Sequence, residues 1–196
     1  MKKAKIIILD GIDGCGKTTI AKYLAKKFNG LYLAEPGKVG LRGKIRKLIL
    51  DKIDYLAEFL LFWADRRLNY QLIKKFLQKP IFIFLDRSFP STLAYQLYAK
   101  NLKKLFSENE YLKIDRIIRD KIEPDAVLIL DAVPETALKR INKRAKTKFE
   151  KINFLRKVRK AYLYLAKKYG WQIIDANKPL EEVKKEIIEV VKNLLK

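Results

Sequence analysis

Eight residues near the start of the chain have the types and spacing of a phosphate-binding loop. Gly11 to Thr18 read GIDGCGKT, which matches the pattern GxxxxGK followed by Ser or Thr. Glycines let backbone N–H groups converge on phosphate oxygens, and the N-terminus of a following helix adds partial positive charge. Lys17 would reach the β- and γ-phosphates, and Thr18 would ligate Mg²⁺. The loop predicts a nucleoside triphosphate site but leaves open what receives the phosphate. We interpret Cys15 within it as a small packed residue rather than a redox sensor.

A second polar pair, Asp86 and Arg87, follows the apolar run Ile81–Leu85. An arginine can hold phosphate oxygens in a bidentate manner, and an acid can hold Mg²⁺ or its water. The pair therefore suits a phosphate and its metal, although a structural ion pair is the alternative. The chain has no Asn-Lys-x-Asp motif, which argues against a GTPase. It has no histidine, which excludes Ser-His-Asp and Cys-His mechanisms and histidine metal sites, and its one cysteine excludes an intramolecular disulfide.

Apolar runs alternate with amphipathic segments along the chain. We expect strands at 6–9, 31–34, 81–85, 126–130 and 171–174, and helices at 17–28, 41–50, 54–78, 90–101, 108–122, 134–144, 153–169 and 180–195. Alternating strands and helices predict the α/β class, here a five-stranded parallel sheet of the P-loop NTPase type with helices on both faces. Four of the strands end in an acid: Asp10, Asp86, Asp131 and Asp175. Because ligands bind at the carboxyl ends of such strands, these acids would lie near the functional edge. For Asp131 and Asp175, capping of the following turn is the preferred interpretation.

Length and composition bound the possible classes of protein. The 196 residues fit a single domain over 1–196, in which the basic stretch 139–151 is the best candidate for a mobile segment. Lys and Arg number 44 against 22 Asp and Glu, for a net charge of +22. Such a charge attracts polyanions, but solvated helix faces explain it better, so we expect no specific nucleic-acid partner. No apolar run is long enough to span a membrane, and the short run Ile6 to Leu9 does not make a signal peptide. We therefore expect a cytoplasmic protein with no membrane partner.

Longer motifs then narrow the class of phosphoryl acceptor. Residues 86–96 read DRSFPSTLAYQ, residues 60–66 read LLFWADR, and residues 35–37 read EPG. Further matches lie in LDAVP at 130–134 and in FLRKVR at 154–159. In this order and spacing, from about residue 5 to 180, the chain resembles the thymidylate kinases, which transfer the γ-phosphate of ATP to dTMP.

The resemblance implies a role for each residue that matches a family motif. Phe62 resembles the phenylalanine that stacks on thymine, and Arg66 the arginine that hydrogen-bonds the base carbonyl. Their i, i+4 spacing puts both on one helix face, as a shared pocket requires. Without the family, Phe62 would be interpreted as a core residue. Tyr95 resembles the tyrosine that crowds the 2′ position, and Asp13 the acid that binds the 3′-hydroxyl.

Together, the motifs and the resemblance predict the composition of the whole site. The ATP-binding residues are Gly11, Asp13, Gly14, Cys15, Gly16, Lys17, Thr18, Thr19 and Arg140. The dTMP-binding residues are Asp13, Glu35, Arg46, Phe62, Arg66, Arg87, Ser91, Thr92, Tyr95 and Gln96. The metal ligands are Thr18 and Asp86, and the catalytic residues are Lys17, Asp86, Arg87 and Arg144.

The resemblance implies a short basic lid at about 140–151, which is expected to supply catalytic positive charge. One subset of the family carries an arginine in the phosphate loop where this chain has Gly14, so the resemblance points to the other subset. Lid candidates are Arg140, Arg144 and Lys148, which are spaced by four and could share one helix face. A solvated face is the alternative interpretation.

The hypothesis that follows is ATP-dependent phosphorylation of dTMP to dTDP by direct in-line transfer, in dTTP synthesis. It implies a transferase that uses Mg²⁺ with ATP and, by resemblance, forms a homodimer. One alternative is a nucleoside monophosphate or deoxynucleoside kinase of other base preference. Another is a basic nucleic-acid-binding P-loop ATPase, which would leave DRSFPSTLAYQ unexplained.

Overall fold

Five strands form one parallel sheet in this computed structural model, which describes residues 3–37, 40–51, 53–141 and 152–194. The order is β2-β3-β1-β4-β5, and every neighbouring pair is parallel. The strands are β1 (Lys5–Asp10), β2 (Leu31–Ala34), β3 (Phe82–Asp86), β4 (Ala126–Asp131) and β5 (Gln172–Asp175). The predicted α/β class with a five-stranded parallel sheet is confirmed. Within the described ranges, no helix is both long and apolar enough to cross a membrane.

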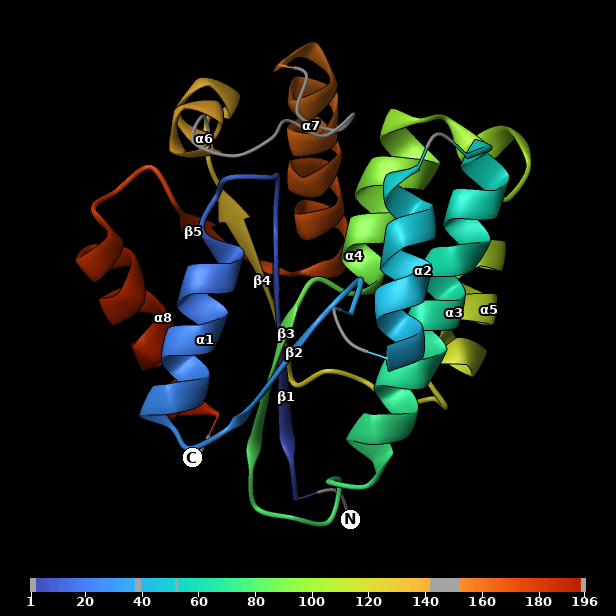
Figure 1. Cartoon of the computed structure of the whole chain (residues 1–196). Helices are drawn as coiled ribbons and strands as arrows, with labels where there is room; N and C mark the ends of the chain where they lie inside the picture. The colour runs from blue at the N-terminus through green and yellow to red at the C-terminus, as the bar shows by residue number, and fades with distance from the viewer. Residues whose placement is uncertain (1–2, 38–39, 52, 142–151, 195–196) are drawn as a thin grey trace.

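Helices cover both faces of the sheet. On one side lie α1 (Lys17–Lys27) and α8 (Leu180–Asn193), and on the other lie α3 (Tyr55–Lys74), α5 (Glu108–Ile118) and α7 (Ile152–Tyr169) (Figure 1). The second helix, α2 (Gly40–Leu50), packs on α3. Two shorter helices, α4 (Phe89–Thr92) and α6 (Pro134–Ile141), begin near the carboxyl ends of β3 and β4. Residues 142–151, which hold most of the predicted lid with Arg144 and Lys148, lie outside the described residues.

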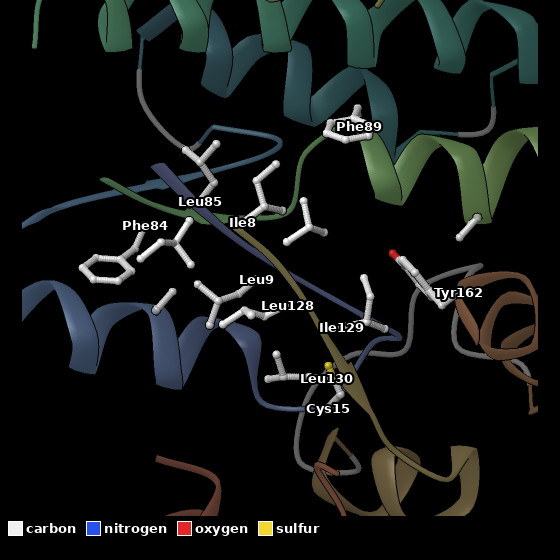
Figure 2. Close-up of a cluster of buried hydrophobic side chains, with 14 of the residues drawn as sticks. Ile8, Leu9, Cys15, Phe84, Leu85, Phe89, Leu128, Ile129, Leu130 and Tyr162 are labelled. Carbon is white, nitrogen blue, oxygen red and sulfur yellow. The ribbon is translucent and has the colours of Figure 1, made fainter. Parts of the chain in front are cut away.

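The central strands are continuous apolar runs because a parallel sheet is covered on both faces. Ile6–Leu9 is wholly buried. Figure 2 shows the resulting alternation: Leu9, Phe84 and Leu128 lie on the side of α1, whereas Ile8, Leu85 and Ile129 lie on the other side. The core thus holds β1, β3 and β4 rigidly, and these strands end at the functional edge.

Local signals place most helix starts correctly. The Asp54 carboxylate caps α3 by accepting hydrogen bonds from the backbone N–H groups of Leu56 (2.8 Å) and Ala57 (3.1 Å), as predicted. Helix ends are less accurate. The third helix ends at Lys74 rather than near Gln78. Beyond Lys74 the chain continues in turns whose hydrogen bonds span three residues, such as Phe76 N–H to Ile73 O.

The helix predicted at 90–101 is in fact two different structures. After α4, residues Leu93–Ala99 form a π-helix, in which the Lys100 N–H bonds the carbonyl of Tyr95, five residues earlier. Hydrophobic periodicity does not distinguish this wider helix from an α-helix, and such insertions occur often at functional sites. Residues Leu93 to Leu97 are all buried, so this part of the helix is enclosed by its neighbours on every side.

The four strand-ending acids lie at one edge of the sheet, as expected, but in different surroundings. Asp10 and Asp86 are buried. Asp175 caps a turn by accepting the Asn177 N–H at 3.0 Å, which confirms the preferred interpretation for it. Asp131 instead forms a bidentate ion pair with Arg159, at 2.6 and 2.8 Å.

Candidate active site

A cavity of about 610 Å³ opens at the carboxyl edge of the sheet, between the phosphate loop and α3. It is lined by most of the residues predicted for the site, namely Asp13, Gly14, Cys15, Gly16, Lys17, Thr18, Thr19, Glu35, Arg46, Phe62, Asp86, Arg87, Ser91, Thr92, Tyr95, Gln96 and Arg140. Gly11 and Arg66 do not line it, and Arg144 is not among the described residues. Segments distant in sequence therefore meet at one site.

The phosphate loop requires its glycines for steric reasons. Gly14 has φ +84°, and a Cβ there would collide with the backbone of Ala137 in α6. Gly11 has φ +141°, and a Cβ there would lie 2.5 Å from the Leu130 carbonyl oxygen. A larger residue such as arginine therefore does not fit at position 14 while α6 packs against the loop in this way.

The Lys17 ammonium lies inside the loop. Its Nζ donates hydrogen bonds to the carbonyl oxygens of Gly11 (3.0 Å) and Ile12 (2.7 Å). Cys15 Sγ lies 3.6 Å from the same Nζ, and burial raises the pKa of its thiol. A buried neutral thiol fits the interpretation of Cys15 as a packed residue.

Two predicted metal ligands lie in direct contact. The Thr18 hydroxyl donates to Asp86 Oδ2 at 2.5 Å, and the Tyr32 hydroxyl donates to the same oxygen at 3.2 Å. No cluster of three or more Asp, Glu, Cys or His residues that could hold a metal occurs in the described chain. The donor set nevertheless fits Mg²⁺, which in nucleotide sites uses one or two protein oxygens, phosphate oxygens and water.

Asp13 and Arg87 form an ion pair across the cavity wall. Asp13 Oδ2 also accepts the Tyr95 hydroxyl at 2.9 Å, and the Arg87 guanidinium donates to Ser91 Oγ at 3.1 Å. Burial alone would raise the pKa of Asp13, but the charges of Arg87 and Lys17 bring it below its usual value. Burial opposes the charge of Arg87, yet Asp13 raises the pKa of the guanidinium further. Both groups are therefore charged at neutral pH.

Three aromatic residues on α3 separate core from cavity. Phe59 and Trp63 are buried, with ring centroids 4.3 Å apart, whereas the partly buried Phe62 lines the cavity. Sequence reasoning without the family would have placed Phe62 in the core. The tertiary structure instead gives it a face on the cavity, where a flat base could stack.

Arg66 lies behind the cavity wall, fully buried. Its guanidinium donates to Glu35 at 3.0 Å, to Asp115 at 2.7 Å, to Tyr111 at 3.1 Å and to Thr92 Oγ1 at 2.9 Å. Phe62 and Arg66 were expected to share a pocket, but only Phe62 lines it. Arg66 contacts Thr92, and Thr92 lines the cavity. Burial raises the pKa of Glu35 to about 7, although the Arg66 charge opposes this shift.

At the far end of the cavity, sequence reasoning found only Arg140. Arg140 donates to the Ala176 carbonyl at 2.8 Å, which brings α6 to the loop after β5. Lys178, Leu180 and Val183 line the same end. They belong to no motif, and only the acid that ends β5 indicated that this loop lies at the functional edge. Arg46 lines the cavity and donates to the Pro36 carbonyl at 3.5 Å, whereas Arg42 does not line it and pairs with the buried Asp65 at 2.9 Å.

Comparison with known proteins identifies the family of the chain. A family model described as thymidylate kinase matches residues 9–187. A protein named probable thymidylate kinase from Methanocaldococcus jannaschii is 41% identical over 192 residues, covering 96% of each chain. A probable thymidylate kinase from Archaeoglobus fulgidus is 37% identical, covering 97% of this chain and 96% of its own. A thymidylate kinase from Thermoanaerobacter sp. is 35% identical, covering 98% of this chain and all of its own. The chain therefore belongs to the thymidylate kinase family.

Proposed function

We propose that this enzyme transfers the γ-phosphate of ATP directly to dTMP in the cavity at the carboxyl edge of the sheet. Family membership supports the reaction, which yields dTDP for nucleotide synthesis. One observation supports its location: the phosphate loop and the segment 86–96 line the same cavity. A donor phosphate on the loop would then lie beside the acceptor residues. Bringing two reactants together in this way accounts for much of the catalysis that an enzyme can supply.

On the donor side, the loop backbone and Lys17 would hold the phosphates of ATP. The Lys17 ammonium would exchange its bonds to Gly11 O and Ile12 O for phosphate oxygens, which carry a full negative charge. Thr18 and Asp86 would hold Mg²⁺, which neutralises charge on the phosphate oxygens when bound. Arg140 would lie beside the nucleoside, since it lines the end of the cavity near Ala176.

On the acceptor side, Arg87 would hold the dTMP phosphate. Its pairing with Asp13 orients the guanidinium across the cavity. Tyr95 packs under the Arg87 guanidinium, with the Arg87 Cζ 5.2 Å from the ring centroid, and would crowd the 2′ position of a ribose. Arg46 would approach the same phosphate. The resemblance supports Arg144 as the catalytic cation of the lid.

The base would be held between Phe62 and the polar side chains on the opposite wall. Thr92 Oγ1 accepts a hydrogen bond from Arg66 at 2.9 Å, and Thr92 itself lines the cavity, where its hydroxyl would face a base carbonyl. In this arrangement Arg66 acts on thymine through Thr92. The buried amide of Gln96 is held by Glu58 at 2.9 Å and closes the same wall.

A coupled assay that offers ATP with each deoxy- and ribonucleoside monophosphate in turn tests the proposed function. We expect dTMP to have the highest kcat/KM, and ribonucleotides to react poorly. A higher kcat/KM with another base would indicate a kinase of different preference. ATP hydrolysis that nucleic acid stimulates, without transfer to any monophosphate, would indicate the ATPase alternative.

The second proposed partner is another copy of the chain. The packed helices α2 and α3 expose four large apolar residues, which a homodimer interface would cover: Leu41, Leu48, Tyr55 and Leu60. Light scattering should give twice the chain mass for the wild type. It should give a lower mass for Leu60→Glu, whose charge would be buried in the interface. A monomeric wild type, or a Leu60→Glu variant that remains dimeric, would contradict this interface.

A further inference from the structure

The buried carboxylate of Asp10 connects three parts of the cavity wall without lining the cavity itself. Its Oδ1 accepts hydrogen bonds from the Gly11 N–H at 2.9 Å, from Ser91 Oγ at 2.7 Å and from the Tyr162 hydroxyl at 2.7 Å. Its Oδ2 accepts the Ser88 N–H at 3.3 Å. One side chain thus holds the first residue of the phosphate loop, the acceptor segment and α7 together.

Tyr162 reaches this carboxylate from a distant part of the chain. Its side chain extends from α7 toward the central strands, with the hydroxyl at its tip (Figure 2). Burial, and then the Asp10 charge, raise the pKa of Tyr162 well above its ordinary value. The hydroxyl therefore stays protonated and donates to Asp10. It also lies 3.2 Å from Ser91 Oγ.

Two routes lead from Asp10 to Arg87. Through the side chains, Ser91 donates to Asp10 while accepting from the Arg87 guanidinium at 3.1 Å. Through the backbone, Asp10 binds the Ser88 N–H directly after Arg87, and the Arg87 N–H bonds the Leu9 carbonyl at 3.0 Å. Arg87 has φ +75°, a conformation that a non-glycine residue keeps only where its surroundings enforce it.

We propose that Asp10 and Tyr162 are positioning residues for the acceptor phosphate, acting through Ser91 and Arg87. This inference rests on the proposed role of Arg87. In-line transfer needs the acceptor arginine at a fixed distance from the phosphate loop, and a misplacement of about 1 Å can lower a rate by roughly 100-fold. Asp10 sets that distance, because it bonds both Gly11 and the segment that carries Arg87.

The Tyr162→Phe variant tests the inference, because it removes one hydroxyl and keeps the ring in the core. Calorimetry should show the dissociation constant for dTMP rising by roughly tenfold, the effect of a lost hydrogen bond to a charged group. Affinity for an unreactive ATP analogue should change less than about twofold, since Gly11 keeps its bond to Asp10. The matched control is Tyr169→Phe, which loses a hydroxyl that donates to the Glu108 carboxylate outside the cavity. It should bind both nucleotides as the wild type does.

The same substitution in an Arg87→Ala background separates positioning from general packing. If Tyr162 acts through Arg87, adding Tyr162→Phe to Arg87→Ala should weaken dTMP binding by less than about twofold more. Asp10→Asn should also weaken dTMP binding, and the two substitutions together should lose less than the product of their separate effects.

Three outcomes would overturn the inference. The first is unchanged dTMP affinity in Tyr162→Phe, and the second is an equal loss of dTMP and ATP-analogue affinity in that variant. The third is a loss of dTMP affinity on adding Tyr162→Phe to Arg87→Ala that is as large as in the wild-type background. If Arg87→Ala itself binds dTMP as the wild type does, the proposed role of Arg87 fails instead. If dTMP affinity falls in Arg87→Ala but not in Tyr162→Phe, the proposed role of Arg87 stands and only the positioning role of Asp10 and Tyr162 is refuted.

Discussion

The hydroxyl of Thr18 donates to the carboxylate of Asp86 across 2.5 Å, although the two residues lie 68 positions apart. Thr18 is in the first turn of α1, and Asp86 ends β3, which pairs with β1 in the sheet. The contact joins the phosphate loop to the strand that delivers the acceptor segment. It also brings together two oxygen atoms of the kind that hold Mg²⁺ beside a nucleotide.

Thr18→Val should weaken the use of Mg²⁺, because valine keeps the shape of threonine and lacks the hydroxyl. We expect the Mg²⁺ concentration that gives half-maximal activity to rise by about tenfold, as for one lost hydrogen bond to a charged group. Thr18→Ser keeps the hydroxyl and is the control. Titration of activity with MgCl₂ at fixed ATP measures both. An unchanged Mg²⁺ requirement in Thr18→Val would remove Thr18 from the metal site.

Lys17→Ala should abolish phosphoryl transfer and leave the fold intact. Among the described residues, the hydrogen bonds of Lys17 Nζ all go to the phosphate loop itself, so few structural contacts are lost. Its charge would act on the phosphates during transfer. The coupled assay and a thermal melt together measure this. Activity above about a tenth of the wild type, where tenfold corresponds to about 1.4 kcal/mol, would refute the catalytic role.

Phe62→Ala should weaken dTMP binding by about one to two orders of magnitude, because stacking on a base contributes roughly 1–3 kcal/mol. Binding of an unreactive ATP analogue should change little. Phe76→Ala, which truncates a partly buried phenylalanine outside the cavity, is the matched control for lost packing. Calorimetry with each nucleotide decides. Equal loss of ATP and dTMP affinity in Phe62→Ala would place the base elsewhere.

Arg66→Gln should destabilise the fold as well as weaken dTMP binding. Removing a buried charge from its partners costs about 3–5 kcal/mol, which lowers the Tm of a domain of this size by roughly 6–20 °C. The control is Arg67→Gln, because the half-exposed pair of Arg67 with Asp120, at 3.0 Å, contributes about 0–1 kcal/mol. Differential scanning calorimetry compares the two. An unchanged Tm in Arg66→Gln would show that the network is not structural.

Glu35 should make stability depend on pH near neutrality. Burial raises the pKa of Glu35 from 4.5 to about 7, so the folded state holds a proton that the unfolded state releases. The contribution is fully present below pH 4.5 and is lost as pH rises to about 7.

Denaturant unfolding at several pH values measures this dependence. Relative to Glu35→Gln, the wild type should lose up to about 1.4 kcal/mol of unfolding free energy per pH unit in that window. The exposed Glu189→Gln variant should follow the wild type at every pH. A constant difference between wild type and Glu35→Gln would show that Glu35 is ionised throughout.

The sequence by itself determined the sheet and the phosphate loop, because both depend on local patterns. Ile6–Leu9 is an apolar run because a parallel strand is covered on both faces, and Gly11 and Gly14 after it adopt positive φ values where a side chain would collide. The acids that end β1 and β3 marked the functional edge for the same reason. The motifs and the family resemblance then indicated most of the residues that line the cavity, but not its far end at Lys178, Leu180 and Val183.

Only the tertiary structure decided what those side chains do there. The i, i+4 spacing puts Phe62 and Arg66 on one face of the helix, but it does not determine whether both side chains reach the cavity. The outcome depends on Asp115 and Tyr111 of α5, which hold the Arg66 guanidinium in the interior. Likewise, nothing near Asp10 in sequence indicates that Tyr162 bonds it from 152 positions away. Hydrogen bonds between distant elements depend on how the helices pack, and local patterns do not encode that packing.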